Sequence, residues 1–129
     1  MSDNHPTRRD ALLAAAVAPL LEAQTGAPPV CFLSAVEIAR LIRTKKMSAR
    51  EALTEHLKQI ERVNPKVNAI VTLVPEMAAE AAQKADEMQA RGEALGPLHG
   101  LPAAHKDLVE TRGIRTTFGS LLYKDHVPT

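Results

Sequence analysis

The sequence is poor in the residues that build many easily recognised sites. Of its 129 residues, one is cysteine, none is tryptophan and only 2% are aromatic. A single thiol, Cys31, excludes an intrachain disulfide and a cysteine-rich zinc site. The scattered aromatics provide no stacking surface for bases, and a net charge of +1 provides no attraction for nucleic acid or acidic lipid. We therefore expect no nucleic-acid partner.

The sequence also lacks an apolar run long enough to span a bilayer. Its most apolar stretch, residues 11–21, is too short for a membrane span and follows the pair Arg8-Arg9 after a single residue, Asp10. This arrangement resembles a twin-arginine export signal, although an ordinary amphipathic N-terminal helix is the alternative. We therefore treat residues 1–30 as an export-signal-like or disordered segment and residues 31–129 as the folded part. An exported, periplasmic location is favoured over a cytoplasmic one.

Two serines mark the beginnings of helices. Ser34 and Ser48 are each followed three positions later by glutamate, the spacing of a capping box, and each precedes an apolar periodic segment. We expect a hairpin of two short helices, the second ending at Asn64-Pro65. Its apolar stripe is expected to lie in the core, and consists of Leu53, Leu57 and Ile60.

The next segments predict an α/β arrangement. Residues 68–74, NAIVTLV, are rich in β-branched side chains and are expected to form a strand. A third, alanine-rich helix is expected from Pro75 to about Arg91, with Gly92 as its stop. A second strand is predicted at residues 101–108, LPAAHKDL, and carries Lys106.

A lysine inside an apolar strand requires an explanation, and the residues alone permit three. The stem of Lys106 can pack while its amine reaches water, or the amine can pair with Asp107 or Glu110. Alternatively, the amine is held out of water and so loses its proton readily, which would allow it to act as a base.

The wider segment favours the catalytic explanation. Residues 96–120, GPLHGLPAAHKDLVETRGIRTTFGS, closely resemble the N-terminal hallmark of the amidase signature family, and the resemblance covers about residues 33–129. The family patterns are G-P-L-H-G-x-P, then K-D, then T-x-G-x-x-T-T-x-G-S. The matching positions are Gly96, Pro97, Leu98, His99, Gly100, Pro102, Lys106, Asp107, Thr111, Gly113, Thr116, Thr117, Gly119 and Ser120.

The resemblance implies a fold, an activity and one site residue. The implied fold is a mixed sheet covered by helices, of which this chain would hold the N-terminal helical hairpin and the first strands. The implied activity is hydrolysis of a carbon–nitrogen bond in a linear, non-peptide amide, through a Ser–cis-Ser–Lys triad that needs no cofactor. In this scheme Lys106 is the general base, and it receives a proton from the nucleophilic serine through the bridging serine.

The sequence departs from the family at the serines. The family's nucleophile and bridging serine lie on a Gly/Ser-rich segment, and no G-S-S-G run occurs in these residues. Ser120 belongs to the T-T-x-G-S element and is not taken as the nucleophile. We therefore expect residues 31–129 to be the N-terminal portion of an incomplete amidase domain, inactive by itself.

Other functions are weighed against this one. His99, His105 and Asp107 lack further ligands at recognisable spacing, so we expect no metal site, and we expect His105 to pack beside the lysine. The expected partner is a small-molecule amide, and homo-oligomerisation is left open. One alternative is a non-catalytic, truncated interaction module, which the nucleotide sequence beyond Thr129 would distinguish from an enzyme. The other is the A subunit of a glutamine-dependent tRNA amidotransferase.

Overall fold

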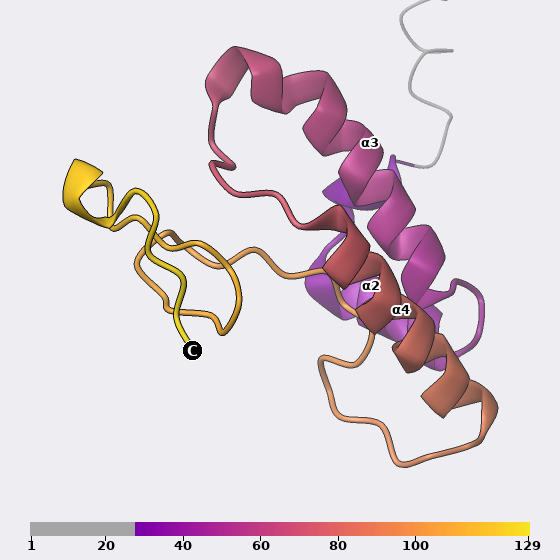
Figure 1. Ribbon diagram of the computed structural model, residues 1–129. Coiled ribbons are helices and arrows are strands. Elements are labelled where there is room, and N and C mark those ends of the chain that lie inside the picture. Colours follow the sequence, from indigo (N-terminus) through magenta and orange to yellow (C-terminus); the bar gives the residue numbers. More distant parts are fainter. Residues whose placement is uncertain (1–27) are drawn as a thin grey trace, which may run out of the picture.

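The computed structural model describes residues 28–129, and the export-signal interpretation falls mostly on residues outside this range. The described part contains three α-helices, α2 (Ala35–Arg43), α3 (Ala49–Val67) and α4 (Pro75–Ala90). Two short 3-10 turns flank them, η1 (Val30–Phe32) and η2 (Leu121–Tyr123). The helices pack together, and the segment after α4 runs back past them before forming a separate looped lobe that ends at the C-terminus (Figure 1).

Both serines cap helices as predicted, but of the two predicted capping boxes only that of Ser48 is complete. The Ser34 side chain accepts a hydrogen bond from the Glu37 amide at 3.2 Å and so begins α2. Ser48 forms the complete capping box, because its hydroxyl accepts from the Glu51 amide at 3.1 Å while the Glu51 carboxylate accepts from the Ser48 amide at 2.7 Å. These bonds satisfy amides that have no partner within the helix, and they place both starts where the sequence predicts them.

The predicted end of α3 is wrong by three residues. Pro65 lies inside the helix, which continues to Val67 and ends at Asn68 in the left-handed conformation, φ 47°. Proline is tolerated here because it removes a single backbone donor close to the helix end. The Asn68 amide then donates to the Asn64 carbonyl at 2.7 Å and closes the final turn.

The two predicted strands do not form among residues 28–129. Neither residues 68–74 nor residues 101–108 form a strand. Within the described residues, β-pairing is limited to an isolated bridge between Thr111 and Ile114. A strand requires a neighbouring backbone to complete its ladder. Here the Asn64 side chain takes that place, since it accepts from the Ile70 amide at 2.9 Å and donates to the Ile70 carbonyl at 3.0 Å.

The core is small and lies where α2 meets the beginning of α3. Ile38, Ile42 and Ala52 are buried, and partly buried apolar residues from neighbouring segments pack around them. Leu101, from the segment after α4, is one of these residues. The first helix therefore buries Ile38 and Ile42 against the second helix and against the lysine-bearing segment.

Helix α4 joins the ends of the other two helices. The Asp86 carboxylate accepts from the Ala49 amide at 2.7 Å, at the beginning of α3, and pairs with Arg50 at 2.8 Å. The buried Gln89 side chain donates to the Ile42 carbonyl in the last turn of α2. Together these contacts hold three helices in one unit.

No helix between residues 28 and 129 combines the length and the apolar character that a membrane crossing needs.

Candidate functional site

The segment that carries Lys106 leaves the helical unit from a tightly packed glycine. Gly100 has φ +74°, and a Cβ at this position would lie 3.1 Å from the Ala49 Cβ and 3.3 Å from the Ile42 Cγ2. Next to it, the His99 ring nitrogen Nε2 lies 2.9 Å from the Ala85 carbonyl of α4. The G-P-L-H-G element is thus fixed against all three helices, and it sets the point from which the lysine segment extends.

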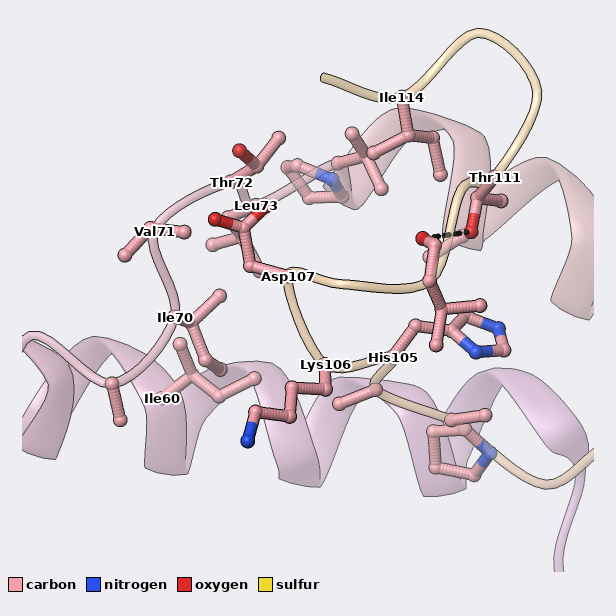
Figure 2. A pocket seen from close by; sticks show the side chains of 18 of the residues that line it. Ile60, Ile70, Val71, Thr72, Leu73, His105, Lys106, Asp107, Thr111 and Ile114 are labelled. Atoms are coloured by element: carbon pink, nitrogen blue, oxygen red, sulfur yellow. Dashed lines mark hydrogen bonds between the residues drawn. The ribbon is translucent and has the colours of Figure 1, made fainter. Parts of the chain in front are cut away.

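Lys106 itself occupies a tight turn. Its carbonyl accepts hydrogen bonds from the amides of Leu108 at 2.7 Å and Val109 at 2.9 Å. Its side chain extends over α3 toward Ile60, on the opposite side from the labelled Asp107 (Figure 2). None of the ion pairs among residues 28–129 involves Lys106, so these residues do not show the alternative in which it pairs with Asp107 or Glu110.

The side chain of Lys106 borders a largely apolar hollow of about 530 Å³. One wall is α3, a second is residues 69–75 and a third is residues 102–107 together with parts of 109–116. The predicted core stripe of α3, Leu53, Leu57 and Ile60, lines this hollow and is only partly buried. The expectation that this stripe lies in the core is therefore wrong for the described residues, because no side chain among them fills the space in front of it.

Three polar groups that line the hollow depart from simple apolar packing. The Thr72 hydroxyl is buried and has no hydrogen-bond partner among the described residues. Lys106 is exposed, so residues 28–129 do not supply the burial that the catalytic explanation predicts. His105 is also exposed, and its predicted packing role is not found in this part of the chain.

Asp107, the neighbour of the lysine, is held by Thr117. One carboxylate oxygen accepts from the Thr117 amide at 2.7 Å, and the other accepts from the Thr117 hydroxyl. The Asp107 carbonyl also accepts from the Phe118 amide at 3.1 Å. Hydrogen bonds from the Thr117 hydroxyl and then the Thr117 amide hold the pKa of the Asp107 carboxyl below its ordinary value. We refer to these bonds between Asp107 and residues 117–118 as the Asp107 clasp.

The clasp closes a loop whose turns require unusual backbone. Phe118 has φ +53° and Gly119 has φ +69°, so two consecutive residues adopt the left-handed region directly after Thr117. The Gly119 amide donates to the Thr117 hydroxyl oxygen at 3.2 Å, which extends the hydrogen-bond chain to Asp107. Such backbone is costly for a phenylalanine and persists only where surrounding contacts hold it.

Contacts of the residues just before Thr117 connect the loop to residues 69–75 and to the C-terminal segment. The Arg115 guanidinium donates to the Val71 carbonyl at 3.0 Å and to the Lys124 carbonyl at 3.2 Å. The buried Thr116 donates through its amide to the His126 carbonyl at 3.0 Å. Sequence reasoning assigned no role to Arg115 or to the clasp, although Asp107 and Thr117 both lie in the recognised motifs.

The structure separates the three residues that were considered for a metal site. His99 faces α4, His105 is exposed and Asp107 is bound to Thr117. Across residues 28–129 there is no cluster of three or more His, Cys, Asp or Glu side chains with metal-binding geometry. Ser120, which we did not take as a nucleophile, accepts from the Leu122 amide at 3.3 Å and caps η2.

Comparison with known proteins identifies the family. The Amidase family model matches residues 51–129, more than half of the chain. The chain therefore belongs to the amidase family, and its fold is that of the amidase signature enzymes.

Curated relatives and solved structures agree with this assignment. The A subunit of glutamyl-tRNA(Gln) amidotransferase from Carboxydothermus hydrogenoformans is 43% identical over 97 residues, which are 75% of this chain and 20% of that protein. Its counterpart from Granulibacter bethesdensis is 46% identical over 87 residues, 67% of this chain and 17% of that protein. This chain thus spans about a fifth of the length of the curated relatives it matches.

Two solved structures share the fold of the described part. A bacterial aryl acylamidase of the amidase signature family is 32% identical with a TM-score of 0.74, over 79% of this chain and 21% of that one. A chain from a vestigial protein complex that reveals the evolutionary origins of an s-triazine catabolic enzyme is 35% identical with a TM-score of 0.71. That match covers 75% of this chain and 21% of that one.

Proposed function

We propose that this chain contributes the general base, Lys106, to an amidase that hydrolyses a carbon–nitrogen bond of a small, non-peptide amide. The observation that carries the proposal is the placement of Lys106 between two fixed points, the packed Gly100 and the Asp107 clasp, both within motifs of the amidase family. In this scheme the nucleophilic and bridging serines lie outside these 129 residues.

The role requires a lysine that can lose its proton. A free lysine, with a pKa of about 10.4, is almost wholly protonated at neutral pH and accepts no proton. Removing the amine from water favours its neutral form. Lys106 is exposed beside an apolar hollow, so we propose that the serine-bearing part of the enzyme covers this hollow and excludes water from the amine.

Substitution of the lysine tests the proposal directly. In the native gene product, Lys106→Ala and Lys106→Arg should each lower kcat for a simple aryl amide by at least about 100-fold, because arginine keeps the charge but cannot release a proton. Lys84→Ala is the matched control, since Lys84 is an exposed lysine on α4. Substantial activity of Lys106→Arg would show that Lys106 is not the base.

The isolated 129-residue chain provides a second test. We expect it to release no product from the same aryl amide, because the scheme places both serines outside it. Turnover by the purified chain that disappears in Lys106→Ala would show that the serines are present after all.

A second candidate function is a subunit role in an amidotransferase. It is supported by relatives at 43–46% identity that are named as the A subunit of glutamyl-tRNA(Gln) amidotransferase. Ammonia release from glutamine by the native gene product, without hydrolysis of simple aryl amides, would favour this candidate. An export signal at residues 1–30 would argue against it.

A non-catalytic interaction module is the third candidate, and the open apolar hollow is the observation that favours it. A stop codon directly after Thr129 would support this candidate. An in-frame continuation that encodes a Gly/Ser-rich run with adjacent serines would support the enzyme.

A further inference from the structure

We infer that Asp107 is a positioning residue for Lys106. Hydrogen bonds from Thr117 anchor Asp107, and Asp107 in turn fixes the backbone next to the lysine. The same bonds keep the Asp107 carboxylate away from the lysine amine. This inference rests on the proposed role of Lys106 as the base. It assigns a purpose to the Asp107 clasp that goes beyond the identity of the base.

The first part of the argument concerns the backbone around the lysine. Residues 102–105, directly before it, make no backbone–backbone hydrogen bond among the described residues, so they do not fix its position. Directly after it, the Asp107 side chain and carbonyl together accept three hydrogen bonds from residues 117–118. The Lys106 carbonyl is itself held by two amides of its turn. The clasp is therefore the nearest fixed point from which the lysine side chain extends.

The second part concerns charge. An ionised carboxylate close to a lysine favours the protonated amine, which is the wrong form for a base. Asp107 adjoins Lys106 in the chain, yet both of its carboxylate oxygens accept hydrogen bonds from Thr117 and no ion pair joins it to the lysine. The clasp thus removes the closest negative charge from the amine.

The remaining titratable groups around the hollow leave Asp107 as the single acid among them. Helix α3 contributes His56, the loop contributes Arg115, and the lysine segment contributes His105, while residues 69–75 contribute none. Release of the Asp107 carboxylate from Thr117 would therefore free the one acidic side chain that lines this hollow to approach the Lys106 amine.

The inference predicts a shift in the pH profile when the Thr117 hydroxyl is removed. Thr117→Val in the native gene product keeps the hydrogen bond from the Thr117 backbone amide to Asp107 but frees the carboxylate oxygen that accepts from the hydroxyl. Activity depends on the neutral amine, and the freed carboxylate favours the charged amine. The rising limb of kcat/KM should therefore move to higher pH, and kcat should fall about 10- to 100-fold through misplacement of the lysine.

Three companion variants complete the experiment. Thr117→Ser restores the hydroxyl and should return the limb to its wild-type position. The double variant Thr117→Val with Asp107→Asn removes the freed charge. The rising limb of its kcat/KM profile should therefore return to the wild-type pH, while its kcat stays low. Thr54→Val is the control, because the Thr54 hydroxyl donates only to the Arg50 carbonyl within α3, at 2.8 Å.

The outcomes separate this inference from the proposed function. If Lys106→Arg is inactive but Thr117→Val keeps the wild-type limb, Lys106 is the base and the inference about Asp107 is overturned. If Lys106→Arg is active, the proposed base is wrong and the inference falls with it. Should Thr117→Val fail to fold, Asp107→Asn decides: it should lower kcat without moving the limb upward, and a wild-type kcat would overturn the inference.

Discussion

Gly100 is the position at which we expect one added methyl group to damage the helical unit most. Its φ of +74° costs an L residue about 1–2 kcal/mol. A Cβ would also lie 3.1 Å from the Ala49 Cβ and 3.3 Å from the Ile42 Cγ2, and both neighbours are only 1% exposed. Overpacking of such buried groups adds about 1–3 kcal/mol. Gly100→Ala should therefore lower the free energy of unfolding by about 2–5 kcal/mol.

The matched control is Gly92→Ala. Gly92 has a similar φ, +72°, but a Cβ there would meet nothing within 4 Å. This variant should lose only the backbone cost of about 1–2 kcal/mol. Urea unfolding followed by far-ultraviolet circular dichroism measures both losses. Equal losses in the two variants would show that close packing of Gly100 against the helices adds nothing to stability.

Three further predictions concern stability. Asp86→Ala removes the acceptor of the Ala49 amide and should lower the free energy of unfolding by about 1–2 kcal/mol, measured by the same urea titration. Thr72→Val replaces a buried hydroxyl that lacks a partner, so it should raise the free energy of unfolding by up to about 1 kcal/mol, and a loss would reveal a partner for this hydroxyl. Hydrogen bonds from Ser48 lower the pKa of Glu51, as those from Thr117 lower the pKa of Asp107. The stability from these carboxylates is complete above their ordinary pKa and is lost as pH falls through the lowered native values. Glu51→Gln should therefore be less stable than wild type at neutral pH, and the difference should shrink as the pH falls through the lowered native pKa of Glu51. A deficit that does not change with pH would contradict the assignment.

The helices were predictable because their signals are local. The capping serines lie three residues from the glutamates they bind, and Pro75 begins α4 as the sequence indicates. The end of α3 was not predictable in this way, because the effect of Pro65 depends on how many backbone hydrogen bonds of the helix remain after it. The capping signals at the helix starts therefore agree with the structure, whereas the stop signal at Pro65 does not.

The strands could not be judged from local composition alone. The β-branched run 68–74 has the residues of a strand, but a strand also needs a partner backbone, and the Asn64 side chain takes that place among the described residues. The stripe Leu53, Leu57 and Ile60 has the periodicity of a core face, and periodicity does not say what covers the face.

The candidate site was predictable by motif and not by contact. The motif singles out Lys106, but nothing in the pattern reveals that Asp107 binds Thr117 ten residues later. The bonds from Asp86 and Gln89 likewise reach back 37 and 47 residues, beyond any local pattern. These contacts become visible only once the chain has folded.

The position of α4 has a consequence for synthesis of the protein. A ribosome releases α2 and α3 first, and the residues that complete their open ends, Asp86 and Gln89, emerge only afterwards. Until then the growing polypeptide exposes an uncapped amide at the beginning of α3 and a free carbonyl at the end of α2. Assembly of the three helices must therefore wait for translation to pass α4, so a pause before that point would prolong the lifetime of an incompletely folded intermediate.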